Sequence, residues 1–330
     1  MLVPAPTRPL PTNPTPPQEP AAAPIVLGER VTVQVEHRQL TLSNLGKVLY
    51  AADGFTKGEV IHYYSQIAPL LLPHLKDRPV TFVRWPDGVE GEQWFEKNTP
   101  RGAPSWLRTV QLPSSGSRGS GKTIEYPLID DLPALVWAAN LAALELHVPQ
   151  WTISDGGRSL PDRLVFDLDP GPDTSIVECC RVAVRLHDLL TADGLAPMPK
   201  TSGSKGMQLL TAIGTDDPRA PSAYAKRLAQ LLARETPNDV TAVMAKAQRT
   251  GRVFIDWSQN NPAKTTIAPY SLRGREQATV STLITWDEVR ACRKPAQLTF
   301  TTDNVLDRTA EIGDLLADLA DQHAPLPTPH

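Results

Sequence analysis

The segment that most constrains how this chain folds is RLVFDLDP, residues 163–170, an apolar stretch that carries two aspartates. In an extended strand, residues two apart share a face, so Asp167 and Asp169 project together while Phe166 and Leu168 point to the other side. Two neighbouring carboxylates repel each other unless a cation lies between them, and oxygen ligands at a strand end suit Mg²⁺ or Mn²⁺. An exposed acidic turn would show the same pair, so other residues must decide.

A second apolar stretch, RVFIDW at residues 252–257, places Asp256 inside another predicted strand. A lone carboxylate there is costly unless it is paired or bound to a metal. Three aspartates on two strands fit the two-metal scheme for an in-line attack on phosphorus. The metals would bridge a triphosphate and activate a primer hydroxyl. The sequence therefore predicts Asp167, Asp169 and Asp256 as catalytic metal ligands.

Positively charged residues follow both acidic strands. TSGSKG, residues 201–206, joins two predicted strands, and its small residues let backbone amides approach an anion while Lys205 supplies charge. KTTIAPYSLRGR, residues 264–275, adds Lys264, Arg273 and Arg275 soon after Asp256. Acidic ligands followed by basic residues are what a metal–triphosphate complex requires. A plain turn at 201–206 and a solvated surface charge at Arg275 are the alternatives.

A separate polar group, Asn44, Lys47 and Lys57, occurs near the N-terminus. Lys57 follows Thr56, which with Glu59 forms a capping-box pattern at the start of a predicted helix. Cations and helix N-termini both attract phosphate. Spacing alone does not decide whether these three residues form a binding site.

The order of predicted elements indicates an α+β or mixed-sheet fold, because strands and helices do not alternate strictly. Helices are expected from Thr56 to a stop at Pro73 and over residues 132–146, 175–192, 224–234 and 310–321, with a hairpin over 106–112 and 123–128. On this interpretation His147 ends a buried helix, where a hydrogen-bonded core histidine is the default. Residues 1–24 hold nine of the 33 prolines, so we expect a disordered tail there. Residues 25–330 are expected to form a single domain.

Composition excludes several classes of protein. The net charge of −3 excludes a bulk polycationic nucleic-acid binder, although not a local basic patch. No apolar run approaches the roughly 20 residues of a membrane helix, and the N-terminus lacks the pattern of a signal peptide. Cys179, Cys180 and Cys292 have no CxxC spacing, which disfavours a disulfide scaffold or a zinc–thiolate site. These features predict a soluble, reduced, cytoplasmic protein.

One stretch matches a phosphate-binding motif in its spacing, but the residues that follow it do not fit that motif. Residues 116–123, GSRGSGKT, match the phosphate-binding pattern GxxxxGK[ST]. Such a loop must open a helix, whose N-terminal amides hold the phosphates. Here TIEYP follows, a strand broken by proline. We therefore expect a hairpin loop whose Arg118 and Lys122 contact a nucleic-acid backbone, with a P-loop ATPase as the alternative.

Eight segments, taken together and in order, resemble one family. They are LSNLGKVLY (42–50), RWPDG (84–88), WFEKN (94–98), LELHVPQW (144–151), RLVFDLDPG (163–171), TSGSKG (201–206), VFIDWSQNN (253–261) and KTTIAPYSLRGR (264–275). They are similar to the polymerase domain of bacterial DNA ligase D, in the archaeo-eukaryotic primase superfamily. The likeness runs from about residue 30 to residue 320. No ligase or nuclease domain is expected, so the chain resembles a stand-alone actinobacterial primase-polymerase.

The resemblance implies an α+β fold with mixed and antiparallel sheets in two packed lobes flanked by helices. It also implies two-metal nucleotidyl transfer with Mg²⁺ or Mn²⁺, gap filling and DNA-end synthesis in non-homologous end joining or base excision repair, and a preference for ribonucleotides. Expected partners are gapped or broken DNA with a 5′-phosphate, NTPs and dNTPs, and an ATP-dependent DNA ligase and Ku. A monomer at the nucleoid is expected.

The resemblance also assigns roles to residues. The metal ligands are again Asp167, Asp169 and Asp256. The expected nucleotide contacts are His147, Ser202, Lys205, Gln208, Gln259, Lys264 and Arg273. The expected pocket for the 5′-phosphate beyond a gap is Asn44, Lys47 and Lys57. Trp94 and Phe95 match an aromatic pair that stacks against the template, and Arg84, Lys97, Arg118 and Lys122 are the other expected DNA contacts.

One residue departs from the family pattern. Gln208 stands where the family usually has histidine, two residues after the glycine of TSGSKG. A neutral amide can hydrogen-bond a phosphate or a sugar but carries no positive charge. Nucleotide affinity, metal preference or pH dependence are expected to differ accordingly. Together with the Pro-rich tail, this change motivates an alternative hypothesis, a catalytically weak module that bridges DNA ends and recruits a ligase.

Overall fold

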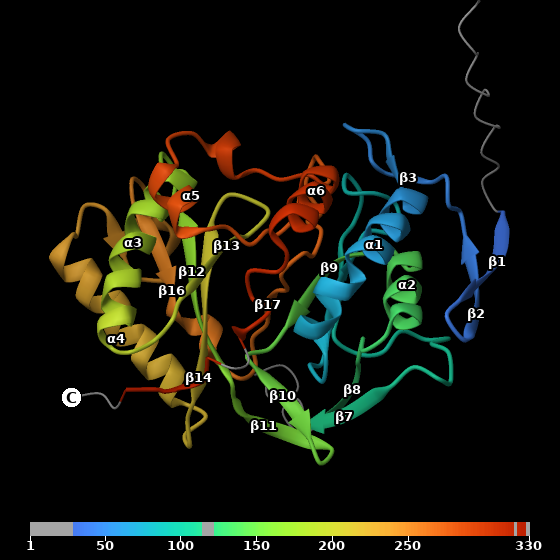
Figure 1. Cartoon of the computed structure of the whole chain (residues 1–330), viewed down its shortest axis with the longest axis horizontal. Helices are drawn as coiled ribbons and strands as arrows, with labels where there is room; N and C mark the ends of the chain where they lie inside the picture. The colour runs from blue at the N-terminus through green and yellow to red at the C-terminus, as the bar shows by residue number, and fades with distance from the viewer. Residues whose placement is uncertain (1–28, 114–121, 320–321, 328–330) are drawn as a thin grey trace, which may run out of the picture.

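The structure, a computed structural model, describes residues 29–113, 122–319 and 322–327 (Figure 1). The Pro-rich residues 1–24, Arg118 and most of the P-loop-like pattern lie outside the described residues, so the predictions made for them stay predictions. The described chain forms two lobes, each built around its own sheet. This arrangement confirms the predicted α+β class with two packed lobes.

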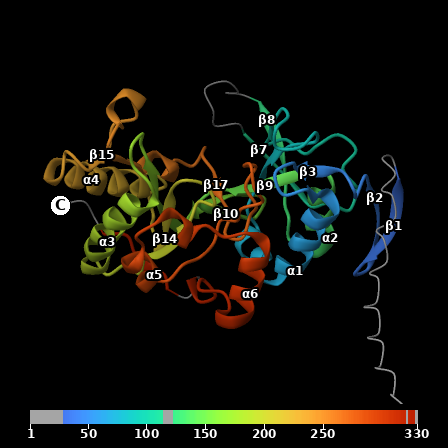
Figure 2. The same ribbon diagram turned by 90° about the horizontal axis from the view of Figure 1, so that it is seen from above.

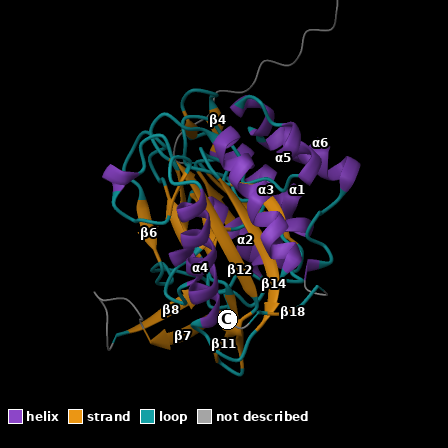
Figure 3. Ribbon diagram, turned by 90° about the vertical axis from the view of Figure 1, so that its left-hand side faces the viewer, coloured by secondary structure: helices purple, strands orange, loops and turns teal. Residues whose placement is uncertain are grey.

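The second lobe contains the larger sheet, of six strands. Across the sheet the strands are β13 (Met198–Thr201), β14 (Met207–Gly214), β12 (Arg163–Pro170), β16 (Val253–Asp256) and β15 (Val240–Thr241), with β18 (Ala324–Pro325) beside β14. All pairs are antiparallel except β15–β16 and β14–β18. Helices α3 (Ile176–Ala192) and α4 (Ala220–Glu235) cover its outer face (Figure 3), and α5 (Trp286–Ala291) packs against α3. The inner face is turned toward the first lobe.

The first lobe contains a four-stranded sheet. Its strands are, in order, β17 (Thr266–Ile267), β9 (Ala143–Val148), β5 (Thr81–Arg84) and β6 (Trp94–Glu96). Helices α1 (Lys57–Leu75) and α2 (Leu132–Asn140) pack together beside this sheet. The remaining hairpins are β1–β2 (Arg30–Val35, Arg38–Ser43), β3–β4 (Val48–Tyr50, Phe55–Thr56), β7–β8 (Thr109–Pro113, Thr123–Pro127) and β10–β11 (Trp151–Ser154, Gly157–Pro161). Among the described residues, short 3₁₀ turns include η1 (Lys246–Gln248), η2 (Trp257–Asn260) and η3 (Pro295–Leu298).

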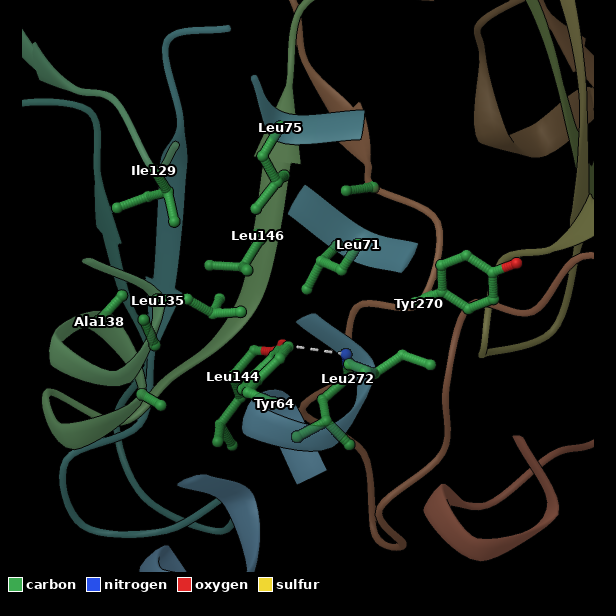
Figure 4. Close-up of a cluster of buried hydrophobic side chains, with 14 of the residues drawn as sticks. Tyr64, Leu71, Leu75, Ile129, Leu135, Ala138, Leu144, Leu146, Tyr270 and Leu272 are labelled. Carbon is green, nitrogen blue, oxygen red and sulfur yellow. Dashed lines mark hydrogen bonds between the residues drawn. The ribbon is translucent and has the colours of Figure 1, made fainter. Parts of the chain in front are cut away.

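The core of the first lobe is completed by residues from the C-terminal third of the chain (Figure 4). Tyr64 of α1 is fully buried, donates to the carbonyl of Leu144 at 2.6 Å and accepts from the amide of Leu272 at 3.1 Å. Helix α6 (Thr302–Ile312) then lies against α1 (Figure 2). The chain therefore crosses from the second lobe back onto the first.

Strand β12 has the predicted two-residue period. Leu164, Phe166 and Leu168 are buried in the core of the second lobe. Val165 belongs instead to the core of the first lobe. Asp167 and Asp169 therefore lie on the face of the sheet that meets the other lobe.

The predicted helix over 132–146 is correct only as far as Asn140. Helix α2 ends at Asn140, Ala142 adopts a left-handed φ of +56°, and residues 143–148 form strand β9. Strand β9 is buried on almost all of its length, so its unbroken apolar run looks like a buried helix in the sequence. His147 consequently lies on a strand.

The predicted helix ends were also wrong in two places. Helix α1 continues past Pro73 to Leu75, because Leu71 and Leu75 pack into the core and outweigh the hydrogen bonds lost at Pro69 and Pro73. The last helix is α6 rather than residues 310–321, since Gly313 ends it with a φ of +71°. No helix in the described part of the chain is long and apolar enough to cross a bilayer.

Candidate active site

The register of the larger sheet brings four polar side chains into one row. Asp167 of β12 pairs with Asp256 of β16 on one side and with Gln208 of β14 on the other. Gln208 in turn pairs with Lys200 of β13. Directly paired residues of adjacent strands share a face, so the row runs Lys200, Gln208, Asp167, Asp256 across four strands.

Asp256 is well supplied with donors, whereas Asp167 and Asp169 are not. Asp256 accepts from the amide of Ser258 at 3.1 Å, from the Ser258 hydroxyl and from the side-chain amide of Gln259 at 2.9 Å, and it lies 3.8 Å from Lys264. Asp167 accepts from the side-chain amide of Gln208 at 2.9 Å. The negative charge on the Asp167–Asp169 side of the row is thus poorly balanced.

Burial and repulsion raise the pKa of both aspartates of β12. Burial raises the pKa of Asp167 to about 7, with the charge of Asp169 adding to the rise and the Gln208 hydrogen bond opposing it. Burial and the charge of Asp256 likewise raise the pKa of Asp169. A cation placed between these carboxylates would relieve the repulsion.

The donor set fits a hard divalent cation, because carboxylate oxygens are the ligands that Mg²⁺ and Mn²⁺ take. Within the described residues, however, no three His, Cys, Asp or Glu side chains are already arranged around one metal position. Asp256 is turned toward its own donors, Ser258 and Gln259. Binding of a metal by all three aspartates would require Asp256 to exchange those hydrogen bonds.

A cavity of about 360 Å³ opens in front of the aspartates, between the two lobes. Most of the residues predicted to contact a nucleotide line it together with Asp167 and Asp169: His147, Ser202, Lys205, Gln208, Gln259 and Arg273. Asp256 and Lys264 do not line the cavity. Arg249 and Arg275 line it as well, so the two acidic residues share the cavity with four cationic side chains.

The TSGSKG loop presents Lys205 to this cavity. The Ser202 hydroxyl accepts from the amides of Ser204 and Gly206, each at 3.2 Å, which closes the loop tightly. Gly203 has a left-handed φ of +68°. A side-chain carbon on Gly206 would lie 2.2 Å from the carbonyl of Leu168, so the loop rests directly on β12. The small residues are therefore needed for backbone packing as well as for anion approach.

His147 is held by a buried carboxylate, Glu145. The Nε2 atom of His147 lies 2.8 Å from Glu145, which also accepts from the amide of Gly274 at 3.1 Å and lies 3.3 Å from Arg273. A carboxylate only accepts, so this hydrogen bond puts a proton on Nε2. Although burial raises the pKa of Glu145, its bond to His147 and the charge of Arg273 leave that pKa below the usual value.

Asn44, Lys47 and Lys57 come together at the start of α1. The amide of Lys47 donates to Asn44 at 3.0 Å, and the amide of Lys57 donates to Lys47 at 2.8 Å. The Lys57 ammonium donates to the carbonyl of Asn140 at 2.8 Å. Burial, with Lys47 and Arg84 nearby, lowers the pKa of Lys57 to about 8. Positive charge therefore accumulates here, although Lys47 pairs with Asp87 at 2.7 Å and Arg84 with Glu96 at 2.6 Å.

The aromatic pair lies on an edge strand. Trp94 and Phe95 of β6 are 51% and 58% exposed, which is unusual for side chains of this size. Lys97 lies over the Phe95 ring at 6.0 Å and donates to the carbonyl of Ala263 at 3.2 Å. Lys122 is exposed just before β8. These side chains are available to a ligand on the first lobe.

Comparison with known proteins agrees with this geometry. Residues 56–316 match the family model of the LigD primase-polymerase domain. The chain belongs to this family. It is 47% identical, over 88% of its length, to the multifunctional non-homologous end joining protein LigD of Mycolicibacterium smegmatis, and 33% identical to the bifunctional LigD of Bacillus subtilis over 84%. It spans 37% and 43% of those two proteins.

A solved structure of a LigD polymerase domain has the same fold. The polymerase domain of Mycobacterium tuberculosis ligase D, determined in complex with DNA, superposes with a TM-score of 0.80 at 43% identity, covering 87% of this chain and 99% of that one. The LigD resemblance seen in the sequence motifs is thereby confirmed. Polymerase domains of this family are DNA-directed polymerases, a class of nucleotidyltransferase, so the predicted enzyme class is confirmed as well.

Three residues of this LigD-type site were missed by the sequence analysis. Glu145 lies two residues before His147 on the same face of β9, a relation hidden by the wrong helix prediction, since helical residues two apart do not face each other. Lys200 is completely buried, and its ammonium donates to the Ser281 hydroxyl at 2.6 Å. Arg249 precedes β16 in a loop with no pattern of its own.

Proposed function

We propose that the protein is a template-directed nucleotidyltransferase that fills short gaps and extends ends in the repair of broken DNA, including non-homologous end joining. The observation that carries this proposal is the cavity lined by Asp167 and Asp169 together with Lys205, Arg249, Arg273 and Arg275, with Asp256 paired to Asp167 on the adjacent strand. Base excision repair is a second setting for the same gap filling. The preference for ribonucleotides rests on the resemblance alone.

The acidic and the basic residues of the site would have different roles. Asp167, Asp169 and Asp256 would hold Mg²⁺ or Mn²⁺. Two such ions supply charge neutralisation for a triphosphate and activation of the primer hydroxyl. Lys205, Arg273 and Arg249 would bind the triphosphate oxygens, and His147, kept in one tautomer by Glu145, would orient the nucleotide.

The 5′-phosphate beyond a gap would bind at Lys57 and Lys47. Among the described residues the Lys57 ammonium has no carboxylate partner, and a phosphate dianion would supply one. Trp94 and Phe95, exposed on the edge strand of the same lobe, would stack on the template bases beside it. An ATP-dependent ligase and Ku would act on the same DNA ends.

Gap filling on a duplex with a one- or two-nucleotide gap tests the proposal. We expect incorporation with Mn²⁺ or Mg²⁺, and we expect Asp167→Asn to reduce it to the level of a blank without protein. Asp188→Asn, an exposed change on α3, is the matched control and should leave incorporation unchanged. Running ribo- and deoxynucleotides in parallel tests the sugar preference. An Asp167→Asn variant that extends primers like the parent would overturn the catalytic assignment.

A second candidate function is favoured by one contact. The Gln208 amide donates to Asp167, the carboxylate most central to the site, and so competes with a metal for that oxygen. If the competition is strong, the protein would bridge DNA ends and recruit a ligase without adding nucleotides. This function predicts tight binding of DNA ends, negligible incorporation by the parent, and a large gain of incorporation in Gln208→His. Robust turnover by the parent would exclude it.

A further inference from the structure

A second charged cavity lies at the other end of the lobe interface, away from the aspartates. It has a volume of about 200 Å³ and is bounded by the end of α1, the start of β12 and the segment that leads into β18. Its cationic lining residues are Lys76, Arg78 and Arg163, and His323 also faces it. Its lining also includes Thr152 of β10 and Ala212 of β14, two strands whose labels stand at the lower centre of Figure 1.

The carboxylates around this cavity already have partners. Asp162 is held by both terminal nitrogens of the Arg78 guanidinium. Asp77 accepts from Arg108 at 2.6 Å. Asp314, whose charge acts on Arg163 from outside the cavity lining, accepts from His74 at 3.0 Å and from the Tyr270 hydroxyl at 2.7 Å. These acids are therefore committed to other groups.

Of the two arginines that line the cavity, Arg163 is the one that is not paired with Asp162. It lies on the same face of β12 as Asp167, four residues away, so its side chain enters the lobe interface. Within the part of the chain that the structure describes, its guanidinium has neither a hydrogen bond nor an ion pair. Burial, and the neighbouring charge of Arg78, lower the pKa of Arg163 to about 9, although the charges of Asp162 and Asp314 oppose the shift. A half-buried guanidinium without a partner is costly, and a bound anion removes that cost.

The neighbours of Arg163 suit a phosphate group. Lys76 is exposed at the rim with no carboxylate partner among the described residues. His323 lies 2.9 Å from the carbonyl of Ile213 through Nδ1. A carbonyl only accepts, so Nδ1 carries the proton, and Nε2 of the neutral ring can only accept, for example from the hydroxyl of a monoprotonated phosphate. The planar fork of an arginine matches the oxygens of a phosphate, and a lysine adds charge at the rim.

We propose that this cavity is an anion site that takes a phosphate group, with Arg163 as its principal ligand. It lies apart from both the aspartate cavity and the Lys57 group, and the proposed polymerase reaction does not use it. The phosphate can come from a free anion or from a nucleic-acid backbone, and the two sources are separated by the experiments below.

The first experiment measures the thermal unfolding midpoint of the whole chain in sodium chloride and in sodium phosphate of the same ionic strength. All proteins carry Lys205→Gln, so that phosphate in the aspartate cavity contributes less. We expect phosphate to raise the midpoint of this parent, and Arg163→Gln to lose most of that rise. Arg163→Lys, which keeps the charge but not the fork, should retain part of it. Arg290→Gln, on α5 and away from the cavity, should retain all of it.

A structural role for Arg163 gives a different result. In chloride we expect Arg163→Gln to unfold no earlier than the parent, since it removes an unpartnered charge. If Arg163→Gln lowers the midpoint by the same amount in chloride and in phosphate, so that the rise with phosphate is kept, the anion site is disproved.

The second experiment identifies the source of the phosphate. The dissociation constant of a gapped duplex is measured over a range of salt concentrations for the parent and for Arg163→Gln. A weaker affinity, with a salt slope reduced by about one, assigns the site to a DNA backbone phosphate. An unchanged affinity, together with the lost response to phosphate, assigns it to a free anion.

Discussion

At the scale of single residues, the active site contains two buried side chains of opposite charge type, Asp167 and Lys200, whose pKa values are both shifted toward neutral pH. Asp167 is protonated, and Lys200 deprotonated, far more readily than either would be in water, because burial penalises both charged forms. They lie two strands apart in the same row, separated by Gln208. The site therefore changes its charge near neutral pH, and metal binding is coupled to that change.

Metal binding should become more favourable as the pH rises through about 7. Between the unfolded pKa of 3.8 and the folded pKa of about 7, the folded chain keeps a proton on Asp167 that the unfolded chain has lost. This contribution to stability is full at low pH and is lost as the pH rises through that window. A metal needs the ionised carboxylate. We expect Mn²⁺ to raise the thermal unfolding midpoint more at pH 8 than at pH 6. An equal or larger rise at pH 6 would contradict this account, and Asp167→Asn should remove the difference.

Lys200→Met tests the coupling between the two buried groups. The charge of Lys200 lowers the pKa of Asp167, so its removal should raise that pKa and shift the pH midpoint of the Mn²⁺ effect upward. The pKa of Lys200 is lowered to about 7, so between about 7 and 10.5 the unfolded chain binds the extra proton and stability rises with pH. The variant should lose that rise. Lys246→Met, at an exposed lysine, is the control; the same pH profile in both variants would contradict the assignment.

At the scale of elements, the sheet register explains why the aspartates and the TSGSKG loop meet. The loop joins β13 to β14, and β14 is the neighbour of β12, so the loop arrives at the end of β12 where Asp169 lies. Gly206 is the point of closest approach, with no room for a side-chain carbon beside the carbonyl of Leu168. The loop and the acidic strand are therefore one packed unit.

Gly206→Ala should push the TSGSKG loop away from β12. The added carbon must displace backbone atoms of β12, and overpacking of this kind costs about 1–3 kcal/mol of unfolding free energy. Gly214→Ala, at the other end of β14, is the matched control, since its added carbon comes no nearer than 4.0 Å to the carbonyl of Ala324. Urea denaturation measures both changes, and we expect the control to stay within about 0.5 kcal/mol of the parent. Equal losses in the two variants would show that the loop does not rest on β12 as described.

The sequence predicted elements well where one face was buried and poorly where both were. The period of two in β12 gave the facing of Asp167 and Asp169 correctly, and the capping box of Thr56 and Glu59 begins α1. Apolar and polar residues do not alternate along strand β9, because the strand is covered on both sides. Its apolar run therefore predicts a helix. The pairing of Asp167 with Asp256 and the position of Lys200 depend on strand register, which tertiary packing decides and local pattern does not.

At the scale of the whole molecule, the two lobes share their chain. The core of the first lobe includes residues from the last quarter of the sequence, among them Tyr270, Leu272 and Val305, whose side chains are 1% exposed or less. The side chains of His74 (in α1) and Tyr270 both form hydrogen bonds with Asp314. These bonds hold the segment around Asp314 against the first lobe, outside its core. The cavity with the aspartates lies between the lobes, so its shape depends on both.

The first lobe should therefore not fold on its own. A fragment of residues 29–161 lacks every C-terminal side chain of its core, and the exposed faces of Tyr64 and Leu144 would have no cover. We expect this fragment to show no cooperative thermal transition by circular dichroism, and mixing it with residues 162–327 to restore one. The expectation of a single two-lobed domain predicts the same result. A cooperative transition in the isolated fragment, unchanged by the partner fragment, would mean that the lobes are independent folding units joined only at the active site.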